Sequence, residues 1–62
     1  MTKVWIVSQH SNRLIGFGDD GPPDDWLWTR VQDRAHAFTE AEAQAFIQVH
    51  LQGADVWLQK VS

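Results

Sequence analysis

Four aspartates form the densest group of chemically active side chains in this sequence. Asp19, Asp20, Asp24 and Asp25 lie within residues 18–25 (GDDGPPDD). Clustered carboxylates can bind Ca²⁺, but the spacing differs from that of an EF-hand loop, and the two prolines restrict the wrapping that a calcium site needs. The cluster could instead present negative charge to a basic partner surface. It could also be a solvated loop with no further role.

The histidines and hydroxyl groups predict no catalytic or metal site. His10, His36 and His50 lie far apart, without the spacing that places two imidazoles on one helical turn. The chain has no cysteine, which excludes thiolate zinc sites and disulfides. A glycine-rich phosphate loop with its lysine is also absent from the sequence. We therefore expect no enzymatic activity, no cofactor and no metal.

The four tryptophans are the strongest remaining signal of function. Trp is enriched at the centres of protein interfaces, because it buries a large area while few torsions are frozen. We expect Trp28, Phe38 and Phe46 to lie in the core. At least one tryptophan, Trp5 or Trp57, is expected on an open sheet face.

Four segments that could position these side chains have β character. Residues 3–8, 13–17, 26–31 and 55–61 are rich in β-branched and aromatic side chains. The first two segments predict a hairpin, with a polar turn between them. Gly16 inside the second segment indicates a bulge, or a place where a bulky side chain lies across the backbone.

One helix is predicted between the third and fourth strands. Thr39 and Glu42 form a T-x-x-E capping box, helix-forming residues continue through Gln52, and Gly53 is a candidate C′ residue. The periodicity predicts one apolar stripe, on which we expect a half-buried and hydrogen-bonded histidine. Its residues are Ala43, Phe46, Ile47 and His50, with Leu51 at the edge.

The predicted fold is α+β, with elements in the order β-β-β-α-β over a single domain of residues 1–62. One helix can cover one face of a four-stranded antiparallel sheet, so the other face stays open. The longest apolar run covers residues 4–7, far too short for a membrane span. We expect a cytoplasmic protein. Its net charge of −3 disfavours non-specific binding to nucleic acid.

Residues 28–43 (WTRVQDRAHAFTEAEA) resemble a pattern in very small proteins of bacteriophages and mobile elements, the anti-CRISPR proteins among them. In that pattern a strand ends in W-T, a single Ala follows, and F-T-x-x-E-A opens a helix. Such proteins are short, acidic and non-enzymatic, and they act on host protein machinery. The resemblance implies no binding residues, because the matched positions are structural. These are Trp28, Thr29, Ala35, Phe38, Thr39, Glu42 and Ala43.

We therefore expect a small acidic module that binds and inhibits a host nucleic-acid-processing complex, by steric block or charge mimicry. Two alternatives remain open. One is a nucleic-acid-binding module that stacks bases on an aromatic sheet. The other is a homodimer that hides its open face in a larger assembly. The expected partner contacts are the acidic loop and tryptophans on a sheet face beside it: Asp19, Asp20, Asp24, Asp25, Trp5 and Trp57.

Overall fold

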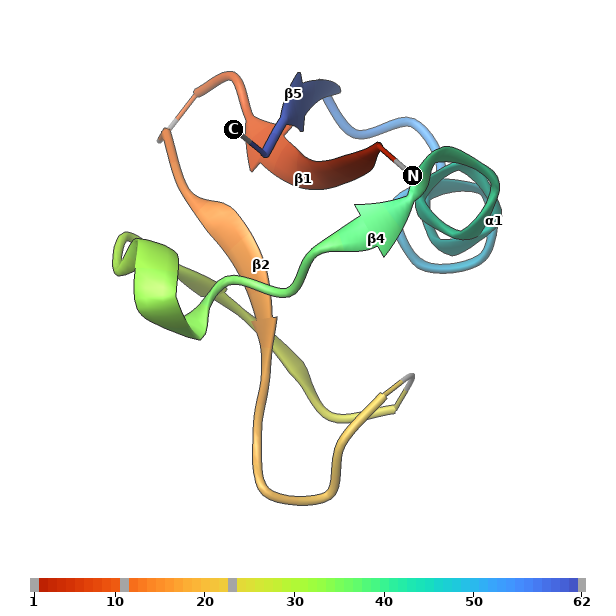
Figure 1. Cartoon of the computed structure of the whole chain (residues 1–62). Coiled ribbons are helices and arrows are strands. Elements are labelled where there is room, and N and C mark those ends of the chain that lie inside the picture. Colours follow the sequence, from red (N-terminus) through yellow and green to blue (C-terminus); the bar gives the residue numbers. More distant parts are fainter. Residues whose placement is uncertain (1, 11, 23, 62) are drawn as a thin grey trace.

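One helix packs on a bent antiparallel sheet, which confirms the predicted α+β class (Figure 1). The computed structural model describes residues 2–10, 12–22 and 24–61. A two-residue strand before the helix, which the sequence did not predict, brings the sheet to five strands. In chain order the elements are β1 (Lys3–Ser8), β2 (Leu14–Phe17), β3 (Trp26–Thr29), the short 3₁₀ helix η1 (Gln32–Arg34), β4 (Phe38–Thr39), α1 (Glu40–His50) and β5 (Val56–Lys60).

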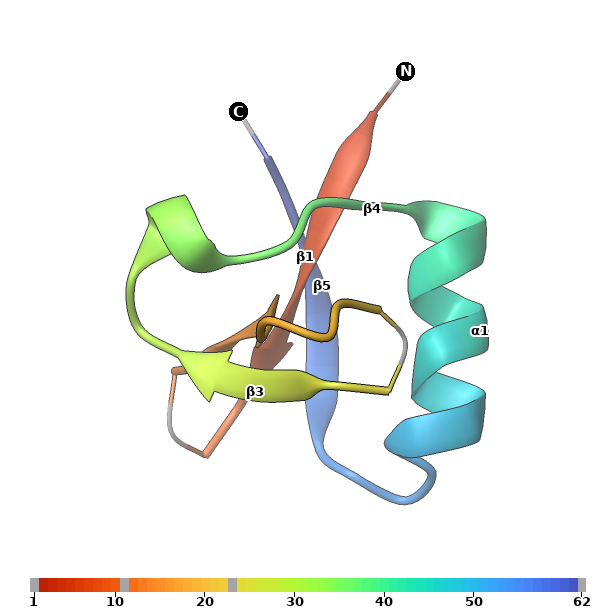
Figure 2. The ribbon, with the colours of Figure 1, turned by 90° about the horizontal axis from the view of Figure 1, so that it is seen from below.

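Strand β1 is the centre of the sheet and pairs with three others. It pairs with β5 along its length and, on its other side, with both β2 and β4. Both strands fit on one edge of β1 because β2 pairs with it only at Val7↔Leu14, which leaves Lys3 and Val4 free to pair with β4. Strand β2 then turns away toward β3 (Figure 1), and Figure 2 shows β3 running across the direction of β1 and β5. The backbone N–H of His36 donates to the Ile15 carbonyl at 2.8 Å, which ties the segment before β4 to the departing strand.

Gly16 lies where this crossing segment comes closest to β2. A Cβ added at Gly16 would lie 2.5 Å from the Arg34 carbonyl oxygen and 3.3 Å from Thr29 Cγ2. The close approach expected at this glycine is therefore present. The group that lies across it is a backbone carbonyl, where the sequence suggested a bulky side chain.

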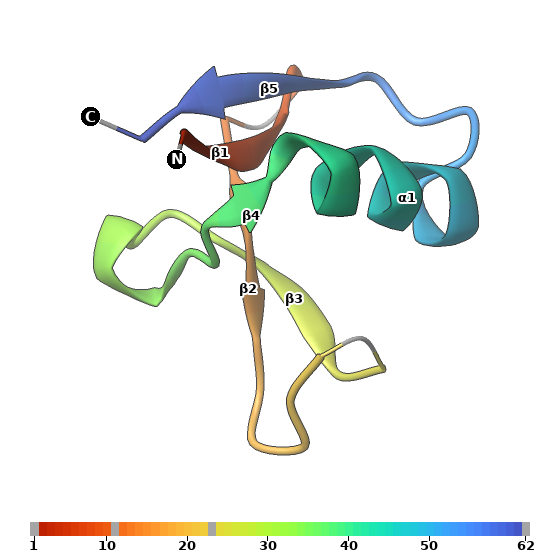
Figure 3. The ribbon, with the colours of Figure 1, turned by 45° about the vertical axis from the view of Figure 1, so that its right-hand side comes forward.

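The core lies between the sheet and α1 (Figure 3). Side chains alternate along a strand, so Val4 and Ile6 of β1 face the helix while their neighbours face outward. Phe38 and Phe46, both predicted core residues, are buried, and Trp28, the third, is half-buried against the core cluster. The whole cluster of buried residues is Val4, Ile6, Ile15, Phe38, Ala43, Phe46 and Leu51.

Helix α1 begins as its sequence predicts. Glu42 N–H donates to the Thr39 hydroxyl at 3.2 Å, and Thr39 N–H donates to the Glu42 carboxylate at 3.1 Å. This completes the capping box. The C-terminal end differs slightly from the prediction: Leu51 is the C-cap, so Gly53, with φ +82°, lies one position beyond C′. Gly53 belongs to the turn that Ala54 N–H closes on the Leu51 carbonyl.

Candidate functional site

The aspartates of the loop between β2 and β3 have unequal roles. Asp25 is half-buried, and its carboxylate accepts from the Asp20 N–H at 3.1 Å. The same carboxylate covers Gly18, where an added Cβ would lie 2.4 Å from an Asp25 oxygen. The backbone N–H of Gly18 also donates to the Asp25 carbonyl at 2.6 Å. Asp25 therefore closes the loop on itself.

The other three aspartates, Asp19, Asp20 and Asp24, are exposed. Within the described residues they form no ion pair and join no group of three potential metal ligands. The loop that carries them projects from the end of the β2–β3 hairpin, away from β1 and β5 (Figures 1 and 3). Pro23, one of the two prolines expected to stiffen the loop, lies outside the described residues.

The tryptophans predicted to contact a partner lie on the sheet face that points away from the helix. Trp57 lies opposite Val7, which in turn lies opposite Leu14, so these side chains form one cross-strand row. Trp57 is 42% exposed, and Trp5 is half-buried. Because both belong to β1 and β5, they lie apart from the acidic loop, and the expected single surface of loop and tryptophans is not present.

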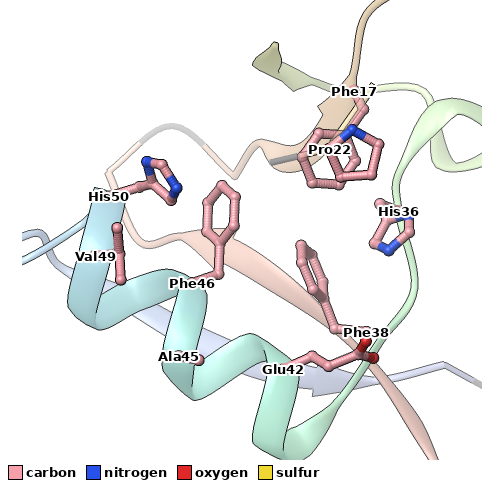
Figure 4. Close-up of a pocket in the computed structure, with 9 residues that line it drawn as sticks. All are labelled: Phe17, Pro22, His36, Phe38, Glu42, Ala45, Phe46, Val49 and His50. Carbon is pink, nitrogen blue, oxygen red and sulfur yellow. The ribbon is translucent and has the colours of Figure 1, made fainter. Parts of the chain in front are cut away.

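An open apolar cleft of about 490 Å³ lies beside the acidic loop instead. Its volume falls in the range of about 300–1,000 Å³ that is usual for ligand sites. In Figure 4 the rings of Phe38 and Phe46 point toward the side occupied by Phe17 and Pro22, with a histidine at each end. The residues that line it are Phe17, Pro22, His36, Phe38, Glu42, Ala45, Phe46, Val49 and His50.

Helix α1 supplies one wall of the cleft. Positions 42, 45, 46, 49 and 50 recur at intervals of three and four residues, so they share one side of the helix. This side lies next to the core stripe and overlaps it at Phe46 and His50. Val49 is 74% exposed, the largest exposed fraction among the large apolar side chains in the described chain. The helix therefore presents unburied apolar surface to the cleft.

Edge-to-face aromatic contacts hold the opposite wall in place. The Phe17 ring lies 4.8 Å from His36, 5.9 Å from Phe38 and 5.9 Å from Phe46, measured between centroids. Trp26 extends the cluster with its centroid 5.7 Å from that of Phe46. Such contacts contribute about 0.5–1.5 kcal/mol each beyond area burial. The cleft is therefore preformed by packed rings.

The electrostatics at one end of the cleft centre on His36 and Glu42. Burial lowers the pKa of His36 from its ordinary 6.5, although the Glu42 carboxylate acts in the opposite direction and Lys3 adds to the lowering. Hydrogen bonds from the backbone N–H and then the hydroxyl of Thr39 hold the pKa of Glu42 below its ordinary value. At neutral pH this end therefore carries a neutral imidazole and a carboxylate.

The other histidines have different surroundings. The His50 ring lies 4.6 Å from Phe46 and 6.4 Å from Trp26, and it makes no hydrogen bond within the described chain. It is half-buried as expected, but the expected hydrogen bond is not there. His10 pairs with Asp55 at 2.8 Å, which fastens the hairpin turn to the start of β5.

Glu42, the carboxylate that lines the cleft, accepts from the Thr39 hydroxyl at 3.0 Å in addition to its capping-box bonds. A second, more polar hollow of about 690 Å³ shares Phe17 and is also lined by Asp19, Asp25 and Arg34. Among the described residues, Arg34 forms no ion pair with either aspartate. The site therefore combines an exposed apolar surface with a neighbouring loop that carries negative charge.

The cleft residues were not predicted as a site, because they come from four separate segments that only the fold brings together. One signal in the sequence could have found part of it. Ala45 and Val49 stand outside the predicted core stripe, yet they are apolar and one helical turn apart. A second apolar strip on a helix with one packed face indicates a further contact surface.

The described residues contain no helix of the length and hydropathy required to cross a membrane. Comparison with known protein families, curated proteins and solved structures found no match for this chain. The site's own residues are therefore the basis for assigning a function.

Proposed function

We propose that this protein is a non-catalytic binding module that docks onto another protein through the aromatic cleft and the acidic loop beside it. One observation carries the proposal: an open apolar cleft whose wall includes Pro22 of that loop. Asp20 and Asp24 are exposed and belong to the same loop, two residues to either side of Pro22 in the sequence. Apolar centres with polar rims are the usual anatomy of protein interfaces.

The partner class follows from charge and from sequence resemblance. A chain of net charge −3 with three exposed aspartates on one loop favours a basic partner surface. Basic surfaces are typical of nucleic-acid-processing complexes. The resemblance of residues 28–43 to small phage proteins supports an inhibitor of the anti-CRISPR kind, which covers such a surface or imitates nucleic-acid charge.

A comparison of two variants tests which face docks. Val49→Lys places a charge in the cleft without disturbing the core, since Val49 is 74% exposed. Trp57→Ser removes the largest exposed side chain of the outer sheet face and serves as the matched control. Both variants and the wild type are immobilised and exposed to host lysate, and the captured proteins are quantified by mass spectrometry.

We expect one protein or complex to be captured by the wild type and by Trp57→Ser, and to be lost with Val49→Lys. Capture that survives Val49→Lys but is lost with Trp57→Ser would move docking to the outer face and refute the proposal. Circular dichroism on each variant shows whether it is folded.

One observation favours a second candidate, a homodimer. Trp57 is 42% exposed on β5, a strand that pairs only with β1 among the described residues. Self-association through β5 would cover both this strand edge and Trp57. Sedimentation across a dilution series, with Trp57→Ser beside the wild type, separates the two. A dimer that dissociates in the variant supports this candidate, and a monomer at all concentrations excludes it.

A further inference from the structure

We infer that the cleft receives an apolar side chain, Phe or Leu in type, from a partner segment that carries Lys or Arg on both sides of it. This inference rests on the proposed docking function and adds the chemistry of the segment that docks. It combines the apolar walls of the cleft with the sign and position of the charges around it.

The walls of the cleft favour an apolar side chain as the occupant. Phe38 and Phe46 contribute buried rings with centroids 5.5 Å apart, and Phe17 contacts both edge to face, so the three rings form one apolar surface of the cleft, which Pro22 also lines. Val49 leaves most of its side chain in water at the mouth. An aromatic or branched aliphatic side chain in this space would cover Val49 and meet ring edges on several sides. Against these rings a polar side chain would lose its water without gaining hydrogen-bond partners, since the polar side chains of the lining are limited to His36, Glu42 and His50.

The acidic groups around the cleft favour basic residues on both sides of that apolar side chain. Asp20 and Asp24 are exposed on the loop that contributes Pro22 to the cleft, and Glu42 lines the cleft itself. Lys3 acts on Glu42 and His36 from nearby and partly offsets the negative charge at that end. On the loop side the exposed aspartates form no ion pair within the described chain, although Arg34 lines a neighbouring hollow together with Asp19. Flanking lysines or arginines complement these acidic groups, and acidic residues or phosphates are repelled by them.

Three blocked peptides test both halves. The probes are acetyl-Lys-Lys-Phe-Lys-Lys-amide, the same peptide with Gly for Phe, and the same peptide with Glu for every Lys. Each is titrated into ¹⁵N-labelled full-length protein, and amide chemical shifts are followed. Chemical shifts report millimolar binding, which is the strength expected of so short a ligand.

We expect the basic Phe peptide to shift the amides of Phe17, Phe38, Phe46 and Val49, with an affinity at least about fivefold above that of either other peptide. The higher affinity of the basic peptide relative to the acidic peptide should shrink at about 0.5 M salt. At this ionic strength, charges that are more than about 3–5 Å apart are largely screened from one another. Equal affinities for the Phe and Gly peptides overturn the apolar half. Equal affinities for the basic and acidic peptides overturn the charged half. Shifts confined to β1 and β5, or absent at about 10 mM peptide, overturn both.

Two variants separate the halves further. Val49→Asn should abolish the preference for Phe over Gly and keep the preference for Lys over Glu. Combined replacement of Asp19, Asp20 and Asp24 by Asn should abolish the preference for Lys over Glu and keep the preference for Phe over Gly. Failure of this inference is distinguishable from failure of the proposed function: a partner whose capture depends on Val49, together with peptides that do not bind, keeps docking and removes the proposed segment chemistry.

Discussion

At Gly16 the chain has no room for a side chain, because the Arg34 carbonyl passes over it. A Cβ there would lie 2.5 Å from that oxygen, which is backbone and cannot rotate away. We expect Gly16→Ala to destabilise the protein by about 1–3 kcal/mol, the usual cost of overpacking. Urea unfolding measures the change, and Gln44→Ala on the exposed side of α1 is the control. Equal stability of Gly16→Ala and wild type would show that the crossing segment moves freely.

His36 gives the stability of the fold a pH dependence with a definite sign. Burial lowers its pKa from 6.5, so the folded state favours the neutral imidazole. A lowered pKa contributes stability that is fully present above pH 6.5 and is lost as the pH falls through the folded-state pKa. The protein should therefore lose stability between neutral and mildly acidic pH.

The measurement is urea unfolding at a series of pH values for wild type, His36→Gln and His10→Gln. The slope of stability against pH below neutrality should flatten in His36→Gln. His10→Gln should keep the His36 contribution, because His10 lies far from the cleft in an exposed pair with Asp55. A slope that disappears only in His10→Gln contradicts the assignment to His36.

At the scale of the element, α1 depends on its first turn. The Thr39 hydroxyl accepts a hydrogen bond from the Glu42 N–H, and the Glu42 carboxylate accepts one from the Thr39 N–H. We expect Thr39→Ala to lower stability by about 1 kcal/mol, as loss of an N-cap does. Thermal or urea unfolding measures it, and Thr2→Ala, at an exposed position before β1, should change nothing. A cost no larger than that of Thr2→Ala would mean that packing alone sets the helix start.

The elements that could be predicted are those with local causes. The capping box defines the start of α1 from three or four neighbouring residues, and the hairpin follows from two adjacent β segments with a polar turn. Strand β4 could not be predicted, because its two residues are a strand only by pairing with Lys3 and Val4 of β1. The division of one side of β1 between β2 and β4 likewise depends on contacts between distant residues.

The candidate site was predictable only in part for the same reason. The exposed charge of Asp19, Asp20 and Asp24 follows from loop composition, whereas the inward turn of Asp25 depends on hydrogen bonds within the folded loop. Phe46 was correctly predicted as a core residue, but its second role in the cleft wall requires Phe17 on the other side. Trp5 and Trp57 lie on a face separate from the acidic loop, and their contact with a partner remains a prediction.

At the scale of the whole molecule, charge argues against nucleic acid as the main ligand. The net charge is −3 and the five cations come from separate parts of the sequence. We expect no salt-sensitive quenching of tryptophan fluorescence when single-stranded DNA or RNA is added at micromolar concentration. The half-buried Trp5 and exposed Trp57 are the reporters. Quenching that weakens as salt is added would instead favour an aromatic sheet that binds bases.

Amide hydrogen exchange of the free and partner-bound protein tests whether docking uses the cleft and the acidic loop. If docking uses the cleft and the acidic loop, the captured partner should slow exchange at residues 17–22 and 45–50. Exchange at residues 56–60 of β5 should stay as it is in the free protein. Protection confined to β5 and the neighbouring β1, with no change around the cleft, would contradict the account.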